Sequence, residues 1–123
     1  MIHVDTSALA GSLCGARTAA PQLRRFIADG IRIAASTLVL YEWWRGPRLP
    51  DELRDQEALF PRSEAVAFGI AEAALAADLY RKVRRARGRE LDIAIAAVAM
   101  ANGAALWTIN RRDFRDIPGL DLA

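Results

Sequence analysis

The chain has 123 residues, of which 53% are hydrophobic and 26% charged, a balance that fits one globular domain spanning residues 1–123 and excludes a disordered chain. The formal net charge is +2, and the basic residues are nearly all arginine, the better bidentate ligand for phosphate. No apolar run reaches the roughly 18 residues of a membrane span, and the first residues lack the basic start of a signal peptide. The single Cys14 excludes an internal disulfide. We therefore expect a cytoplasmic protein without a membrane segment.

Short β-type runs alternate with helical patterns along the chain. The first run, residues 2–4, ends in Asp-Thr-Ser, as a strand does where it enters a loop. The sequence predicts strands at residues 2–4, 31–35, 65–68, 105–108 and 120–122. It predicts helices at residues 21–29, 37–45, 50–59, 70–87 and 91–101. This alternation indicates the α/β class, with a central, mainly parallel sheet covered on both faces.

Four acidic residues occupy positions where a parallel sheet would place a ligand site. Ligands bind beyond the carboxyl ends of such strands, and Asp5 follows the first predicted strand while Asp113 follows the strand at residues 105–108. Glu42 and Asp92 lie in the early turns of apolar helices. Each acid alone is typical of a helix cap, a turn or a solvated surface. Unpaired carboxylates beside apolar stretches are costly, however, and the joint pattern predicts a common site.

A divalent cation would remove that cost. Mg²⁺ and Mn²⁺ prefer oxygen ligands, and a bound ion can polarise a phosphodiester and lower the pKa of a water molecule. His3 is the only histidine, and we expect it to pack on its strand rather than act as a base. The sequence therefore favours metal-dependent phosphodiester hydrolysis over a histidine mechanism, with the number of ions left open.

Four segments, in this order, resemble the PIN-domain family. They are Val4–Ser7, Leu40–Glu42, Leu91–Ala97, and Leu106–Phe114 followed by Ile117–Leu120. Within that family the chain is similar to the VapC-like toxins, compact ribonucleases of prokaryotic toxin–antitoxin pairs. The resemblance implies a three-layer α/β/α fold with a sheet of four to five short strands, and the activity of an endoribonuclease.

The resemblance also implies residue roles and partners. The metal-binding and catalytic residues would be Asp5, Glu42, Asp92 and Asp113, with support from Thr6, Ser7, Thr108 and Asn110. Whether Asn110 or Asp113 faces the metal stays open. The cofactor would be Mg²⁺ or Mn²⁺, the substrate RNA, and the protein partners a second copy of the chain, as a homodimer, and a cognate VapB-like antitoxin.

A basic run precedes Asp92 and admits two interpretations. Arg81, Lys82, Arg84, Arg85, Arg87 and Arg89 crowd into nine residues. They fit a solvated helix end, where cations suit the helix dipole, or a patch that contacts RNA phosphates through Arg84, Arg85 and Arg87.

Trp43 and Trp44 are a second open case: one should pack in the core, while the other would lie at an interface or stack on a base.

Other functions remain as alternatives. A phosphatase would place a second acid two residues after Asp5, where this chain has Ser7. A PIN-like nuclease that processes RNA or cuts DNA, and is not a toxin, stays open. A non-catalytic nucleic-acid-binding module is the second alternative, although four clustered acids would repel phosphate in such a protein.

Overall fold

The computed structural model describes all residues, 1–123, and is built on a three-stranded parallel sheet. The strands are β1 (Ile2–Val4), β2 (Ile33–Ala34) and β3 (Ala105–Trp107), in the order β2-β1-β3. Val4 pairs with Trp107 in the register of β1 and β3, and Asp5 N donates to Trp107 O at 2.8 Å. The residues that follow β1 and β3 therefore leave the sheet side by side, at its carboxyl edge.

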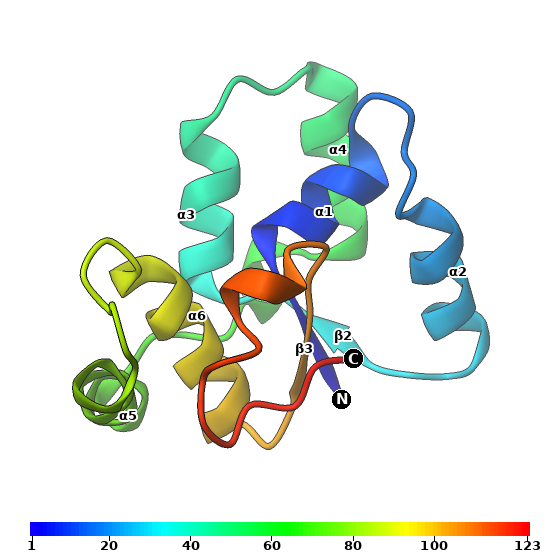
Figure 1. Cartoon of the computed structure of the whole chain (residues 1–123). Helices are drawn as coiled ribbons and strands as arrows, with labels where there is room; N and C mark the ends of the chain where they lie inside the picture. Colours follow the sequence, from blue (N-terminus) through cyan, green and yellow to red (C-terminus); the bar gives the residue numbers. More distant parts are fainter.

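Six helices surround this sheet. They are α1 (Thr6–Leu13), α2 (Ala20–Ala28), α3 (Thr37–Arg45), α4 (Pro50–Leu59), α5 (Ile70–Lys82) and α6 (Glu90–Ala101), with 3₁₀ turns η1 (Arg62–Glu64) and η2 (Arg111–Asp113). The sheet lies between α2 on one side and α6 on the other, α5 packs on α6, and α1, α3 and α4 gather beyond the carboxyl ends of the strands (Figure 1). None of the helices combines the length and the apolar character that crossing a bilayer requires.

Local sequence signals account for most of these elements. Ser36 caps α3, because its hydroxyl accepts a hydrogen bond from Val39 N at 3.2 Å. Glu52 accepts from Leu49 N at 2.8 Å and so satisfies a free amide at the start of α4. Helix α6 is apolar nearly all round, with Ala96, Ala97, Val98 and Ala99 fully buried, as expected of a helix enclosed between the sheet and α5.

Two predicted strands are wrong, and the sheet has three strands instead of four to five. Residues 65–68 form only one bridge, between Val66 and Ser36, and the terminal segment forms only one, between Leu122 and Leu106. Both segments have extended backbone beside the sheet, but each pairs at a single residue, too short a ladder for a strand. The α/β class and the parallel arrangement are confirmed.

The helices correct the prediction at two places. Helix α5 ends at Lys82 rather than at residue 87, because Val83 is extended and Arg85 adopts a left-handed φ of 55°. Helix α1 was not predicted at all, since Gly11 lowers its helix propensity. The chain packs closely at that glycine: a Cβ there would lie 3.2 Å from Ala19 Cβ and 2.5 Å from Ile109 Cδ1, so that the exposed Ile109 side chain would have to move.

Candidate metal centre

Asp5 is held at the carboxyl edge of the sheet by two hydroxyl groups. It follows β1 directly, occupies the N-cap position of α1 and is buried, with 4% of its surface exposed. Its Oδ2 accepts hydrogen bonds from Ser7 Oγ and Thr108 Oγ1, both at 2.8 Å. Because both donors use Oδ2, the other oxygen, Oδ1, keeps its lone pairs for a ligand.

The same hydroxyls join α1 to the loop after β3. Ser7 Oγ and Thr108 Oγ1 lie 3.1 Å apart, and Ser7 Oγ accepts from Ile109 N at 3.1 Å. Thr108 Oγ1 accepts from Asn110 N at 3.0 Å. This network fixes the orientation of Asp5 and places Asn110 beside it.

Glu42 approaches from α3 and is oriented by α1. Thr6 Oγ1 donates to Glu42 Oε1 at 2.7 Å, and Arg45 Nη2 lies 3.4 Å from Oε2. The neighbouring tryptophans separate as expected from the sequence: Trp43 is fully buried, whereas Trp44 is 41% exposed. Packing of Trp43 therefore fixes the turn of α3 that presents Glu42.

Asp92 completes a pocket with Asp5 and Glu42. This pocket, of about 270 Å³, is called the acidic pocket here and is lined by Asp5, Thr6, Ser7, Ala10, Glu42, Asp92 and Asn110. Partial burial, together with the negative charges of Asp5, Glu42 and Asp113, raises the pKa of Asp92 to about 6. The carboxylates are therefore close enough to repel one another.

Asp113 lies outside the acidic pocket. It belongs to η2 and lines a neighbouring pocket with Asp116 and four arginines, although its charge still acts on Asp92. Asn110, the N-cap of η2, lines the acidic pocket itself. Of these two candidates for the fourth position, the structure thus places Asn110 in contact with the pocket and Asp113 at its border.

The residues of the acidic pocket fit a divalent cation that keeps part of its water shell. No three His, Cys, Asp or Glu side chains form a group that could hold an ion directly. Mg²⁺, however, usually binds through only one or two carboxylates together with several waters. The pocket offers oxygen ligands from Asp5, Glu42, Asp92 and the Asn110 amide, and a dication would offset the burial and the repulsion that together raise the pKa of Asp92.

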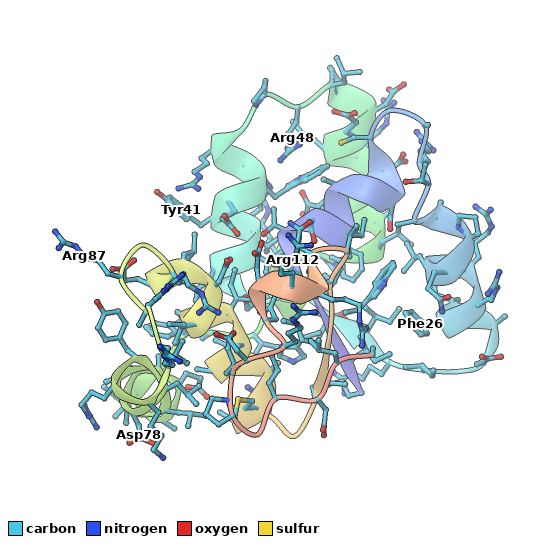
Figure 2. The ribbon with its side chains drawn as sticks, in the orientation of Figure 1. Phe26, Tyr41, Arg48, Asp78, Arg87 and Arg112 are labelled. Carbon is cyan, nitrogen blue, oxygen red and sulfur yellow. The ribbon has the colours of Figure 1, made fainter.

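The predicted RNA-binding arginines separate into two groups. Arg84 and Arg85 line the pocket that contains Asp113, together with Arg112, whereas Arg87 does not. In Figure 2 the Arg87 side chain points away from the body of the molecule. Arg112 was not predicted as a member of this group, because nothing in the sequence indicates that η2 lies against the turn after α5.

The chain is similar to known proteins in sequence pattern and in fold. The family model described as PIN domain matches residues 2–120. No curated protein sequence matches the chain. Among solved structures, VapBC2 from Rickettsia felis, bound to a DNA fragment from the promoter, is 21% identical, with a TM-score of 0.76 and coverage of 100% of this chain and 98% of that one.

Two further structures have the same fold. DNA-bound VapBC from Salmonella typhimurium is 22% identical over 99% of this chain and 96% of that one, with a TM-score of 0.77. VapBC-5 from Mycobacterium tuberculosis, a member of the VapBC family of toxin–antitoxin systems, is 23% identical over 97% and 91%, with a TM-score of 0.61. At these identities the likeness establishes the arrangement of the elements.

Proposed function

The chain belongs to the PIN-domain family, and from this premise we propose that it is a metal-dependent endoribonuclease, the toxin of a VapBC-type toxin–antitoxin pair. The observation that carries the proposal is the convergence of Asp5, Glu42 and Asp92 on one pocket at the carboxyl edge of the sheet. Asp5 lies between β1 and α1, Glu42 in α3 and Asp92 in α6, and only the fold brings them together.

The proposed reaction is hydrolysis of a phosphodiester bond. When bound, Mg²⁺ or Mn²⁺ would polarise the phosphodiester and lower the pKa of a water molecule. The oxygen of water forms the new bond to phosphorus, the bond from phosphorus to O3′ breaks, and O3′ takes up a proton. The products are a 5′-phosphate and a 3′-hydroxyl.

The chain's own residues have separate tasks in this proposal. Asp5 and Asp92 supply carboxylate ligands, and Thr108 and Ser7 hold Asp5 in its orientation by hydrogen bonds of 2.8 Å. Thr6 holds Glu42 at 2.7 Å, so that its carboxylate faces the same pocket. Asn110 presents its amide, and Asp113 adds negative charge at the border of the pocket.

No histidine is available as a general base. His3 is 2% exposed, its two ring nitrogens have no hydrogen-bond partner in the chain, and it does not line the acidic pocket. Burial also lowers its pKa. A mechanism in which histidine removes a proton from the RNA 2′-hydroxyl is therefore not supported, which favours attack by water.

The test is incubation of the purified protein with a panel of single-stranded RNAs in Mg²⁺, Mn²⁺ or EDTA. We expect cleavage only with the metals and products that carry a 5′-phosphate and a 3′-hydroxyl. Products that end in a 2′,3′-cyclic phosphate, or full activity in EDTA, would contradict the mechanism. A parallel panel of single-stranded DNA of the same sequences separates the ribonuclease from a nuclease that acts on DNA.

The proposal extends to protein partners. VapBC structures from three bacteria have this fold, and the M. tuberculosis structure is of a toxin–antitoxin system. In this chain, Tyr41 directly precedes Glu42 in α3 and is 54% exposed, and Trp44 follows Glu42 by two residues and is 41% exposed. Large exposed aromatics are favoured at protein interfaces. We assign this surface to contacts with a VapB-like antitoxin and with a second copy of the chain.

A further inference from the structure

A second pocket, rich in arginine, adjoins the acidic pocket. It has a volume of about 430 Å³, and no hydrophobic residue lines it. We call it the arginine bowl; its residues are Arg84, Arg85, Arg89, Arg112, Asp113 and Asp116. One wall is the turn between α5 and α6, and the other is η2 with the residues that follow it.

The turn between α5 and α6 is shaped so that its arginines face the bowl. Val83 and Ala86 are each 7% exposed and anchor the turn to the core, while Arg84 and Arg85 between them are exposed. Arg85 adopts a φ of 55°, a left-handed conformation that is unfavourable for a residue with a Cβ atom. Strained backbone that places an unpaired charge in a pocket points to a binding role rather than to packing.

Arg89 holds the two walls together. Its Nη2 and Nη1 form a bidentate ion pair with Asp116, at 2.6 Å to Oδ1 and 2.9 Å to Oδ2. The same guanidinium donates to Asp113 O at 2.8 Å and to Arg84 O at 3.3 Å. The shape of the bowl is therefore fixed before any ligand arrives, and the charges of Arg89 and Asp116 offset each other.

The other three arginines of the bowl have no partner. The side chains of Arg84, Arg85 and Arg112 make no hydrogen bond and no ion pair within the chain, whereas Arg81 and Arg89 do. Of the two acids of the bowl, Arg89 pairs with the carboxylate of Asp116, but it contacts only the backbone oxygen of Asp113. The bowl thus has an excess of positive charge, which an anionic ligand with several oxygens would neutralise.

The bowl and the acidic pocket carry opposite charge but are lined by the same two segments. At η2, Asn110 lines the acidic pocket, whereas Arg112 and Asp113 line the bowl. At the start of α6, Asp92 lines the acidic pocket and the N-cap residue Arg89 lines the bowl. Arg89 precedes α6 directly and feels the charges of both Asp92 and Asp113. A nucleic acid strand with one phosphate over the acidic pocket would therefore carry a neighbouring phosphate past the bowl.

We propose that the arginine bowl binds a backbone phosphate of single-stranded RNA next to the scissile one, through Arg84, Arg85 and Arg112. This inference rests on the proposed function, because it takes RNA as the substrate. No aromatic or aliphatic side chain lines the bowl, so it offers no aromatic platform for a base, whereas its guanidinium groups match phosphate oxygens. The bowl recognises the backbone and contributes affinity without sequence preference.

The experiment measures binding without cleavage. Metal-free protein in EDTA is titrated with a fluorescent single-stranded RNA of about 12 nucleotides, and anisotropy is followed as a function of salt concentration. The variants are Arg84→Ala, Arg85→Ala and Arg112→Ala. Arg87→Ala is the matched control, because Arg87 is an exposed arginine of the same turn that does not line the bowl.

We expect each bowl variant to bind RNA about threefold to tenfold more weakly, and the triple variant to lose about one to two units of salt slope. Arg87→Ala should stay within about twofold of the wild type. In cleavage assays the bowl variants should raise KM and leave kcat nearly unchanged, since the contact lies away from the bond that breaks.

The inference is overturned if the bowl variants bind like Arg87→Ala, or if the metal-free protein does not bind RNA at low salt. If the bowl variants lose more affinity for an acidic peptide than for RNA, the bowl belongs to a protein partner and the inference is overturned as well. Failure of the proposed function is distinguishable. A protein that cleaves no RNA, but whose RNA binding depends on Arg84, Arg85 and Arg112, retains the bowl as a phosphate site.

Discussion

Thr108 Oγ1 donates a hydrogen bond of 2.8 Å to Asp5 Oδ2 across a separation of 103 residues in the chain. The two residues meet because Val4 and Trp107, which precede them, are paired in adjacent parallel strands. The bond is buried, and it directs the other carboxylate oxygen of Asp5 toward the acidic pocket. Thr108 is thus a positioning residue that acts through Asp5.

Replacement of Thr108 by valine tests this role. Thr108→Val keeps the branched shape but removes the hydrogen-bond donor. Groups that orient a metal ligand typically contribute 10-fold to 100-fold to metal affinity or activity, so we expect the cleavage rate to fall by about 10-fold to 100-fold. The Mn²⁺ concentration needed for half-maximal cleavage should rise in the same measurement. Thr18→Val, at an exposed position, is the control. Unchanged metal dependence of Thr108→Val would contradict the role.

Replacement of Asp5 by asparagine removes the buried carboxylate itself. We expect Asp5→Asn to lower cleavage by more than about 100-fold, a larger loss than that of an orienting group. The fold should persist, because an amide oxygen can still accept from Ser7 and Thr108. Thermal stability without metal should be unchanged or slightly higher, since one repulsive charge is gone. An active or an unfolded Asp5→Asn protein would contradict the assignment of Asp5 as a ligand.

The raised pKa of Asp92 predicts an unusual pH dependence of stability. Its pKa is about 6 in the folded protein, compared with an ordinary value of 3.8 that applies to the unfolded chain, so the folded state binds the proton more tightly. Lowering the pH from 7 to 5 should therefore add about 1 kcal/mol to the free energy of unfolding of the metal-free protein. Burial lowers the pKa of His3, which acts in the opposite direction as the pH falls below 6.5.

Chemical denaturation in EDTA at pH 5, 6 and 7 isolates the contribution of Asp92. The difference between the wild type and Asp92→Asn removes the effect of His3, which both proteins share. Asp92→Asn should be the more stable protein at pH 7, and the difference should shrink toward pH 5. A difference that is constant with pH would show that neither burial nor the charges of Asp5 and Glu42 raise the pKa of Asp92.

His3 is predicted to be dispensable. Its two ring nitrogens are buried without a hydrogen-bond partner, an arrangement that costs stability. His3→Val retains an apolar strand residue and should leave the free energy of unfolding unchanged or raise it by about 1 kcal/mol. Val4→Ala, on the same strand, should instead lower it by about 2 kcal/mol. A marked loss of cleavage in a stable His3→Val protein would give His3 a role in catalysis.

The sequence predicted the elements whose signals are local. The strand before Asp5 and the helix that carries Glu42 were expected and are confirmed, because the apolar pattern of each acts within a few residues, and the structure adds the Ser36 cap. Helix α1 was missed because its stability comes from packing: Ala8 and Leu9 are fully buried, while Gly11 disfavours a helix in isolation. The segments at 65–68 and 120–122 have strand-like sequences but pair at one residue each.

The candidate site was predictable only in part for a related reason. Positions next to strand ends can be recognised from the sequence, and Asp5, Glu42 and Asp92 indeed line one pocket. The choice between Asn110 and Asp113 depends on η2, a 3₁₀ turn whose direction no hydrophobic pattern encodes. The arginine bowl depends on a contact between segments far apart in the chain, which Arg89 makes with Asp116.

The surface beside the acidic pocket predicts control by a protein inhibitor. Tyr41 is exposed next to Glu42, and Arg45 lies 5.2 Å from the Tyr41 ring centre and 3.4 Å from the Glu42 carboxylate. This side of α3 thus already combines an aromatic face with a carboxylate that accepts a guanidinium. An amphipathic antitoxin helix could pack on Tyr41 and place its own Arg or Lys in the acidic pocket, where the cation would compete with the metal.

Expression of the protein alone should then slow bacterial growth, and co-expression with the small gene next to its own should restore it. Asp5→Asn should be harmless without the partner, which shows that toxicity comes from cleavage. Tyr41→Ala should cleave RNA normally but need more antitoxin for rescue, because the lost contact belongs to the interface. Harmless expression of a folded, active enzyme would contradict the toxin function while leaving the nuclease intact.

The dimer has its own test, because light scattering at micromolar concentration should give twice the mass of the 13.5 kDa chain, and a monomer would contradict it.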